Sequence, residues 1–442
     1  MKKKVTIFWL RRDLRLHDNA GLYYALKSGK DPVLPLFIFD EEILGKLEDE
    51  DDARVTFIHD TITGLSEELT DLGSSIIVRH GKPIEIWKDL LKTYEVSAVF
   101  TNHDYEPYAE DRDAAIAKLL DGQNIGWQTY KDHVIFEKGE ILKGDGDPYI
   151  VFTPFKRKWL EKLSSRPDSE FISFYFKPYP NEEYFDQFIK MKPVPLPSLS
   201  DIGFVRSQLD IPSTTVPKKT IREYDKRRDF PGVEGTSKLG VHFRFGTISI
   251  REKARKAYKL NATFLSELIW RDFYAQILAF FPHVVDGCFR PKYDQIPWRN
   301  NEVEFVAWCE GLTGYPMVDA GMRELNATGY MHNRVRMVVA SFLTKHLLIN
   351  WQWGEAYFAR KLLDFDLASN NGGWQWAAGC GTDAAPYFRI FNPESQFKKF
   401  DPKAKYVGKW VPEFDGFDYV QPIVDHKEAR ERCLRVYKEA LG

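Results

Sequence analysis

Four side chains that could bind a ligand or do chemistry share one face of a predicted helix. Glu267, Trp270, Arg271 and Tyr274 have the spacing i, i+3, i+4 and i+7, which brings an acid, an indole, a guanidinium and a phenol together on an otherwise apolar helix. This set is unusual for a buried face and indicates a binding or catalytic surface. A protein interface or an internal Glu–Arg ion pair would explain the same stripe, because buried charges are usually paired.

A second segment, residues 362–393, combines carboxylates with glycines and tryptophans. Asp364 and Asp366 precede an Asn-Asn-Gly-Gly sequence, which Trp374 and Trp376 follow. Glycines let the backbone approach a planar ligand closely, and carboxylates accept hydrogen bonds from N–H or hydroxyl groups. Carboxylates at this spacing also suit a hard cation. No further acidic cluster or histidine pair accompanies them, so we expect an organic cofactor and no metal.

Two further segments carry polar groups at suggestive positions. The loop at residues 235–240 (GTSKLG) gathers backbone N–H groups, two hydroxyls and an ammonium group ahead of helix-forming sequence, an arrangement that suits a phosphate. It matches neither the P-loop nor the Rossmann fingerprint, and an ordinary surface turn explains it equally well. Asn333 and Met337 share a helix face with Arg334 beside them, although a solvated helix would show the same pattern.

The first 136 residues predict the elements that make a parallel sheet covered by helices. Short apolar or β-branched runs alternate with amphipathic stretches, the pattern of a doubly wound α/β domain. We expect strands at 5–10, 33–39, 75–79, 96–101 and 127–136, and helices at 20–27, 53–72, 83–94 and 109–120. Ligands of such sheets bind at the carboxyl ends of the strands, near the point where the strand order reverses, so this domain could hold a small molecule.

The rest of the chain predicts a linker and an all-helical domain. Residues 137–204 become rich in proline and serine, which do not fit helix interiors or central strands, so we expect a long surface connector. From 205 to 442 apolar residues recur at three- and four-residue steps, as in helices. The expected organisation is therefore an α/β domain at 1–136, a linker at 137–204 and a helical domain at 205–442.

The charge of the chain is unevenly distributed. The 442 residues carry 62 basic and 64 acidic side chains, a net charge of −2. Residues 1–200 hold 27 basic and 35 acidic side chains, whereas residues 201–442 hold 35 basic and 29 acidic side chains. The halves therefore carry −8 and +6, so only the second half suits a polyanionic partner. No run of about 20 apolar residues and no signal-peptide core is present, so we expect a cytoplasmic protein with no membrane contact.

These segments together resemble the photolyase/cryptochrome family, and within it the class I cyclobutane pyrimidine dimer photolyases. The resemblance extends over nearly the whole chain. It rests on FWLRRDLRLHDNAGL, RRDFPGVEGTSKLG, ELIWRDFY, MHNRVRMVVASFLTK and DFDLASNNGGWQWAAGCGTDAAPYFRIFNP. It implies an N-terminal antenna domain and a C-terminal helical domain that binds FAD. The resemblance also implies the activity of a deoxyribodipyrimidine photo-lyase. In that reaction light excites reduced FADH⁻, an electron passes to a flipped-out dimer in UV-damaged DNA, and the cyclobutane ring opens.

The resemblance also implies residue roles. FAD contacts would come from Tyr224, Thr236, Ser237, Lys238, Leu239, Gly240, Arg271, Asn333, Asp364, Phe365, Asp366 and Asn370, the last at the flavin N5. The damaged DNA would meet Arg228, Glu267, Trp270, Tyr274, Asn333, Arg334, Met337 and Trp376. Trp298, Trp351 and Trp374 would pass electrons inward to an oxidised flavin. Desolvation would keep Glu267 protonated, so that it could donate a hydrogen bond to a thymine carbonyl.

Several positions discriminate between relatives. Asn370 is typical of photolyases, because plant cryptochromes carry Asp there, and His332 lacks the partner histidine of enzymes that repair (6-4) photoproducts. Tyr108 and Ala109 stand where folate-binding members carry Asn-Glu, so a second, antenna chromophore would be a deazaflavin or another flavin, or the antenna site would be empty. We expect a monomeric repair enzyme. The alternatives are a blue-light cryptochrome receptor and a nucleotide-binding protein of the electron-transfer-flavoprotein kind.

Overall fold

The computed structural model describes residues 2–165, 167–169 and 172–442. Its contacts divide the described chain into two compact units. The first comprises the described residues of Met1–Glu137, Glu161–Thr214 and Leu239–Lys256, and the second comprises Lys138–Leu160, Thr215–Lys238 and Ala257–Gly442. The segments that we expected to be linker and helical domain therefore each contribute to both units.

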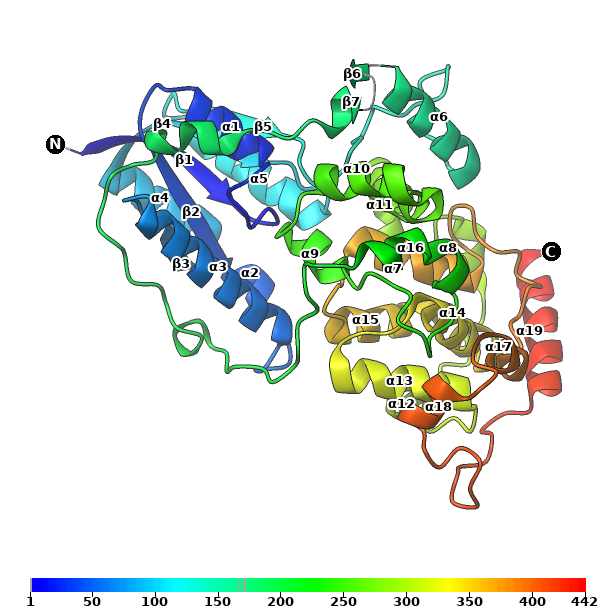
Figure 1. The fold of residues 1–442 in the computed structure, drawn as a ribbon. Coiled ribbons are helices and arrows are strands. Elements are labelled where there is room, and N and C mark those ends of the chain that lie inside the picture. The colour runs from blue at the N-terminus through cyan, green and yellow to red at the C-terminus, as the bar shows by residue number, and fades with distance from the viewer. Residues whose placement is uncertain (1, 166, 170–171) are drawn as a thin grey trace. The chain divides into compact units, whose positions relative to one another are not determined.

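A five-stranded parallel sheet organises the described part of the first unit, as the sequence predicted (Figure 1). The strands are β1 (Lys3–Leu10), β2 (Val33–Asp40), β3 (Ile77–Gly81), β4 (Tyr94–Asn102) and β5 (Gly126–Tyr130), in the order β3-β2-β1-β4-β5. The central strand β1 aligns Trp9 with Leu36 of β2 and with Thr101 of β4. The strand order reverses beside β1, so its carboxyl end lies at the switch point of the sheet.

The fifth strand ends six residues before the predicted bound at residue 136. Asp132 explains the early end, because its carboxylate accepts hydrogen bonds from Arg15, Arg251 and the backbone N–H of Ala20. These contacts tie residue 132 to Ala20, the first residue of a helix, so the chain leaves the sheet after Tyr130. Val134 and its two successors are still buried, which explains why the sequence looked like a longer strand.

Helices cover both faces of the sheet. They are α1 (Ala20–Lys27), α2 (Glu41–Leu44), α3 (Ala53–Asp71), α4 (Pro83–Thr93) and α5 (Pro107–Asp121). Alternate residues of β1 point to opposite faces: Phe8 joins a core with α1 and α3, and Ile7 joins a core with α4 and α5. Side-chain caps at Asn19 and Asp52 and a proline at the first position of α4 fix the helix starts that the sequence predicted.

The proline-rich region holds more regular structure than we predicted. Helix α6 (Phe152–Ser164) precedes most of the prolines and buries Phe155, Trp159 and Leu163 at helical spacing. Strands β6 (Pro167–Ser169) and β7 (Ile172–Ser173) form an antiparallel pair, and the 3-10 turns η1 (Phe174–Phe176), η2 (Asn181–Gln187) and η3 (Ser200–Ile202) follow. The first unit also includes α9 (Gly240–Phe245) and the first turns of α10 (Ile250–Leu260).

Helices build the second unit, as predicted (Figure 1). They are α7 (Lys218–Arg222), α8 (Tyr224–Arg227), α11 (Ala262–Phe280), α12 (Glu302–Glu310), α13 (Pro316–Thr328), α14 (Asn333–Ser341), α15 (Trp351–Lys361), α16 (Leu367–Ala378), α17 (Pro393–Phe400), α18 (Lys405–Trp410) and α19 (His426–Leu441). A π-helical turn, η6 (Phe342–His346), extends α14, and the 3-10 turns η4 (Pro282–Val285) and η5 (Pro291–Gln295) follow α11. One apolar core joins α12 to α16 with α18.

The helices were also compared with the requirements of a membrane span. In the described ranges, no helix has both the length and the apolar character needed to cross a bilayer.

Candidate functional site

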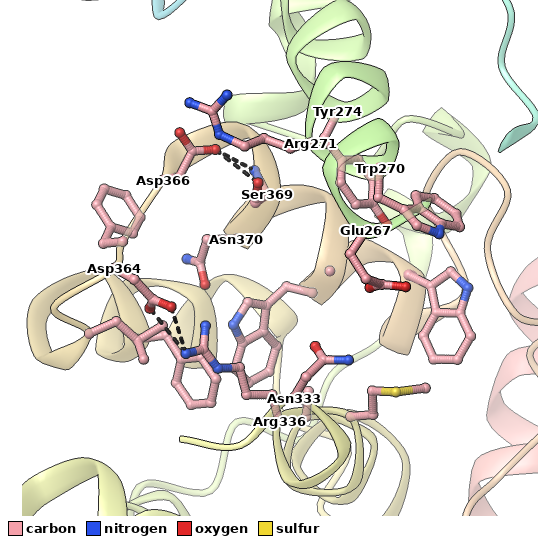
Figure 2. A pocket seen from close by; sticks show the side chains of 18 of the residues that line it. Glu267, Trp270, Arg271, Tyr274, Asn333, Arg336, Asp364, Asp366, Ser369 and Asn370 are labelled. Carbon is pink, nitrogen blue, oxygen red and sulfur yellow. Dashed lines mark hydrogen bonds and ion pairs between the residues drawn. The ribbon is translucent and has the colours of Figure 1, made fainter. Parts of the chain in front are cut away.

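A cavity of about 430 Å³ lies inside the second unit, between α11 on one side and α14, α15 and α16 on the other (Figure 2). Its volume is in the range of small-molecule sites. The side chains around it are Arg228, Glu267, Trp270, Arg271, Tyr274, Asn333, Arg336, Met337, Ala340, Phe358, Leu362, Asp364, Phe365, Asp366, Ser369, Asn370, Gly373, Trp374 and Trp376.

The cavity brings together most of the residues singled out in the sequence. Those that line it are Arg228, Glu267, Trp270, Arg271, Tyr274, Asn333, Met337, Asp364, Phe365, Asp366, Asn370, Trp374 and Trp376. The remaining ones, Tyr224, Thr236, Ser237, Lys238, Leu239, Gly240, Trp298, Arg334 and Trp351, do not belong to its wall. Segments more than 100 residues apart in sequence therefore converge on one space.

Helix α11 presents the predicted stripe to this space. Asn261 caps the helix by accepting hydrogen bonds from the N–H groups of Thr263 and Phe264. The residues between the stripe positions, such as Ile269 and Phe273, are fully buried. Their burial fixes the rotation of the helix, so Glu267, Trp270, Arg271 and Tyr274 face the cavity.

The two aspartates of the DFD sequence have different partners within the protein. Asp364 accepts two hydrogen bonds of 3.0 Å from Nη2 of Arg336. Asp366 caps α16 by accepting from the N–H of Ser369 at 3.1 Å and from its hydroxyl at 2.9 Å. Burial acts to lower the pKa of Arg336, but the Asp364 carboxylate outweighs it and raises that pKa above its usual value. Both carboxylates are therefore fixed in position at the cavity wall.

Asn370 is oriented by a buried glutamate. Its Nδ2 donates to the backbone oxygen of Glu355 at 3.1 Å and to Oε1 of the same residue at 2.7 Å. Burial raises the pKa of the Glu355 carboxyl, and the hydrogen bond from Asn370 partly offsets the rise. Because both contacts use the amide nitrogen, the oxygen Oδ1 is left to accept hydrogen bonds.

Sequence reasoning missed two residues that contact the wall from outside, Glu355 and Phe152. It also missed six residues of the wall: Arg336, Ala340, Phe358, Leu362, Ser369 and Gly373. Arg336 lies three residues after Asn333 on the same helix, so helical spacing could have revealed it. Glu355 is an isolated acid on α15, whose role depends on a partner 15 residues away. Phe152 stacks on Trp270, with ring centroids 3.6 Å apart and planes 7° apart, yet it lies in the region that we expected to be linker. Only the folded structure shows these last two contacts.

Glu267 has a charged neighbour that the sequence did not reveal. We expected a protonated acid in an apolar pocket, but the Arg228 guanidinium donates to its carboxylate in an ion pair. The Glu267 side chain is 29% exposed, so desolvation is incomplete. Burial acts to lower the pKa of Arg228, and the Glu267 charge raises it above its usual value. A guanidinium group therefore holds Glu267 at the cavity, and its protonation state stays a prediction.

The tryptophans of the expected electron path occupy different environments. Trp374 is 2% exposed, lines the cavity, and makes edge contacts with Phe358 at 5.0 Å and Trp308 at 6.1 Å between ring centroids. Trp351 is equally buried in the same core, and Trp298 is partly exposed and packs on that core. The order of transfer through them stays a prediction.

The loop expected to bind a phosphate is packed beside Tyr330. The hydroxyls of Thr236 and Tyr330 are 3.2 Å apart, and the Lys238 ammonium lies 5.4 Å from the centre of the Tyr330 ring. The Arg336 guanidinium lies 5.9 Å from the same ring and reaches the cavity. Thr236 and Lys238 are therefore connected to the cavity wall through Tyr330.

The cavity has the features expected of a site for a large aromatic cofactor. Aromatic rings, paired carboxylates and guanidinium groups surround it, and a Cβ added at Gly373 would have no atom within 4 Å, so the backbone there borders open space. Within the described ranges, no three His, Cys, Asp or Glu side chains are grouped to hold a metal ion. The α/β unit and this cavity agree with the class of protein that the sequence resembles, in which a helical domain binds a flavin.

Comparisons with known proteins agree with this class. The family model "FAD binding domain of DNA photolyase" matches residues 264–418, and "DNA photolyase" matches residues 6–173. A curated deoxyribodipyrimidine photo-lyase of Halobacterium salinarum is 39% identical, with 99% of each chain covered. A bacterial class III photolyase from Agrobacterium tumefaciens has a TM-score of 0.85 at 31% identity, covering 100% of this chain and 98% of the other.

A second solved structure has two flavins. The archaeal photolyase from Sulfolobus tokodaii, described with two FAD molecules, has a TM-score of 0.80 at 34% identity and covers 99% of this chain and 100% of its own. The chain belongs to the DNA photolyase family: it is an enzyme that binds FAD and acts in DNA repair. The matched FAD-binding region contains every cavity-lining residue except Arg228.

Proposed function

We propose that this enzyme uses light to repair cyclobutane pyrimidine dimers in UV-damaged DNA. Bound FAD, in its reduced form, supplies the electron that opens the cyclobutane ring and accepts it again afterwards. The observation that carries the proposal is that one cavity has two chemically different sides. Asp364, Asp366 and Asn370 lie on one side, and Glu267 and Trp270 lie on the other (Figure 2).

The first side suits the flavin. Arg336 fixes Asp364, and the start of α16 fixes Asp366, so both carboxylates are already positioned as acceptors for ribityl hydroxyls or ring N–H groups. Asn370, held by Glu355, presents an amide oxygen that can accept from the N–H at flavin N5. Thr236 and Lys238 would hold the diphosphate, since a hydroxyl and an ammonium group are both donors.

The second side suits an extruded pyrimidine pair. A dimer must leave the duplex before a buried group can reach it, and because damaged bases stack poorly, extrusion costs only a few kcal/mol. The stacked pair Phe152 and Trp270 offers a rigid aromatic wall, and Met337 and Trp376 complete an apolar surface for the bases. The Glu267 carboxylate can accept a hydrogen bond from a thymine N–H.

The deciding experiment is illumination of the reduced enzyme with an oligonucleotide that contains one thymine dimer. We expect the dimer to revert to two thymines, measured by chromatography, in the light and not in the dark. A protein that binds FAD but leaves the dimer intact would instead be a signalling flavoprotein of the cryptochrome kind, which is the alternative function.

Glu267→Gln tests the substrate side of the cavity. The amide keeps the size of the side chain and one acceptor oxygen, but it replaces the carboxyl group that pairs with Arg228. We expect the repair quantum yield to fall several-fold while FAD absorbance and flavin content stay unchanged. Full yield in this variant and in Glu267→Ala would show that Glu267 takes no part in repair.

A further inference from the structure

Four charged side chains form a neutral group at the edge of the cavity. Arg334 donates from Nη2 to Oδ1 of Asp229 at 2.7 Å, and Nε of Arg228 lies 4.0 Å from the same oxygen. Arg228 in turn is ion-paired with Glu267. Two guanidinium groups and two carboxylates thus cancel at the place where the proposed substrate enters.

The arginine side chains are held in place and remain within reach of solvent. The Arg334 guanidinium lies over the Phe400 ring at 4.4 Å, and its Nη1 is 3.7 Å from Sδ of Met337, which lines the cavity. The side-chain exposures are 19% for Arg334, 23% for Arg228 and 39% for Asp229. A phosphodiester can therefore reach both guanidinium groups, but it must compete with carboxylates that already occupy them.

We propose that Asp229 is a specificity determinant that suppresses binding to undamaged DNA. This inference rests on the proposed function. The Asp229 carboxylate neutralises Arg334 and repels an approaching phosphate. The Glu267 carboxyl group has the same effect at Arg228. Partly exposed ion pairs are weak enough to be exchanged, and guanidinium binds phosphate through paired hydrogen bonds. Only DNA whose extruded lesion also fills the cavity gains enough binding to exchange both pairs, so the neutral group selects for damage.

The test is Asp229→Asn, with affinities for an undamaged duplex and for the same duplex carrying one thymine dimer measured at several salt concentrations. We expect the affinity for undamaged duplex to rise about 5- to 10-fold, with a log–log salt slope steeper by about one, because one guanidinium is released. The affinity for the damaged duplex should rise less, because Arg334 loses the group that aligns it. The ratio of the two affinities therefore falls.

Two controls separate charge from geometry. Asp415→Asn removes the same charge from an exposed position of the same unit and should leave both affinities within twofold of the wild type. Asp229→Glu keeps the charge and should keep the affinity for undamaged duplex near the wild-type value. Equal effects of Asp229→Asn and Asp415→Asn, or unchanged affinities in Asp229→Asn, would overturn the proposal.

A further variant keeps the proposal testable if Asp229→Asn does not fold. In Arg334→Gln we expect the affinity for undamaged duplex to change less than twofold, because this arginine is already neutralised, while the affinity for the damaged duplex falls more than tenfold. Equal losses for both duplexes would contradict the proposed role of Asp229. Failure of the wild-type protein to prefer the damaged duplex would instead contradict the proposed function itself.

Discussion

At the scale of single residues, the site depends on groups whose partners are other protein side chains. Asp364 is held by Arg336, Asn370 by Glu355, and Glu267 by Arg228. Each partner sets the orientation or charge of the residue that faces the cavity. Of these partners, Glu355 alone lies outside the cavity wall, so its substitution should alter the orientation of Asn370 without removing any group from the wall.

Trp374 provides a test at this scale. It lines the cavity in a buried position, so replacing its indole with phenylalanine removes an oxidisable ring from the cavity wall while keeping an aromatic side chain there. We expect Trp374→Phe to photoreduce oxidised FAD poorly, measured by absorbance under blue light with a thiol present. The variant should still repair dimers once the flavin is reduced chemically.

The control is Trp410→Phe, at a partly buried position of α18 outside the cavity wall, which should photoreduce normally. Loss of both activities in Trp374→Phe would mean that this tryptophan supports the flavin site itself and not an electron path.

His332 gives a pH prediction. Its Nδ1 accepts from the N–H of Arg334 at the start of α14, and burial, together with the Arg336 charge, lowers its pKa to about 4. Between pH 6.5 and 4 the unfolded chain binds a proton at this residue and the folded chain does not. The free energy of unfolding should therefore decrease as the pH falls through this window, by about 3 kcal/mol at most.

His332→Asn isolates this contribution. Asparagine can cap the helix through its side-chain oxygen but does not titrate. Urea unfolding between pH 7 and 4 should show a weaker pH dependence in the variant than in the wild type. Part of the dependence should persist, because burial also lowers the pKa of His346, to about 3. Identical pH dependences would show that His332 is not buried as a neutral cap.

At the scale of elements, two adjacent glycines of α16 have opposite surroundings. A Cβ at Gly372 would lie 2.3 Å from the ring of Tyr274, whereas a Cβ at Gly373 would meet no atom within 4 Å. Gly372 therefore allows α16 to approach α11 closely, and Gly373 faces the cavity.

The pair makes a matched experiment. Gly372→Ala should lower the melting temperature, because it separates two packed helices. Gly373→Ala should leave stability unchanged or raise it, since alanine favours a helix by about 1 kcal/mol over glycine, yet it should weaken FAD binding because the methyl occupies the cavity. Thermal unfolding of the flavin-free protein and flavin titration would measure both effects. A loss of stability in Gly373→Ala would contradict this packing.

The positions of the secondary-structure elements were predicted from the sequence better than any other feature. The strands of the sheet and the starts of α1 and α3 follow from local patterns, and the caps at Asn19 and Asp52 explain why these helices begin where they do. Contacts between segments were not predictable from such patterns. The end of β5 depends on ion pairs of Asp132 with distant arginines, and the surroundings of Glu267 depend on Arg228, 39 residues away. Local periodicity contains no information about these partners.

At the scale of the whole molecule, the uneven charge bears on how DNA binds. The net charge of −2 combines −8 in residues 1–200 with +6 in residues 201–442. Arg228 and Arg334 at the cavity, with Lys398 and Lys399 on α17, make four candidate phosphate contacts. Binding therefore relies on a few contacts and not on the bulk charge of the protein.

This count predicts the salt dependence. With about 0.9 counterions released per phosphate, four contacts give a log–log slope near −4 for duplex DNA. Fluorescence anisotropy of a labelled dimer-containing duplex across a salt series would measure it, and Lys398→Gln should reduce the slope by about one. A slope beyond about −8 would indicate a much larger contact surface than these residues provide.

The close packing of Trp374 has a consequence for how the sequence can vary. A Cβ at Gly354 would lie 2.1 Å from the indole, so the backbone of α15 and the ring of Trp374 occupy adjoining space with no room for a methyl group. Positions 354 and 374 therefore constrain each other during evolution: a side chain at 354 is compatible only with a smaller or displaced ring at 374. Among family members, substitutions at these two positions should occur together, and the loss of the glycine should coincide with the loss of this indole.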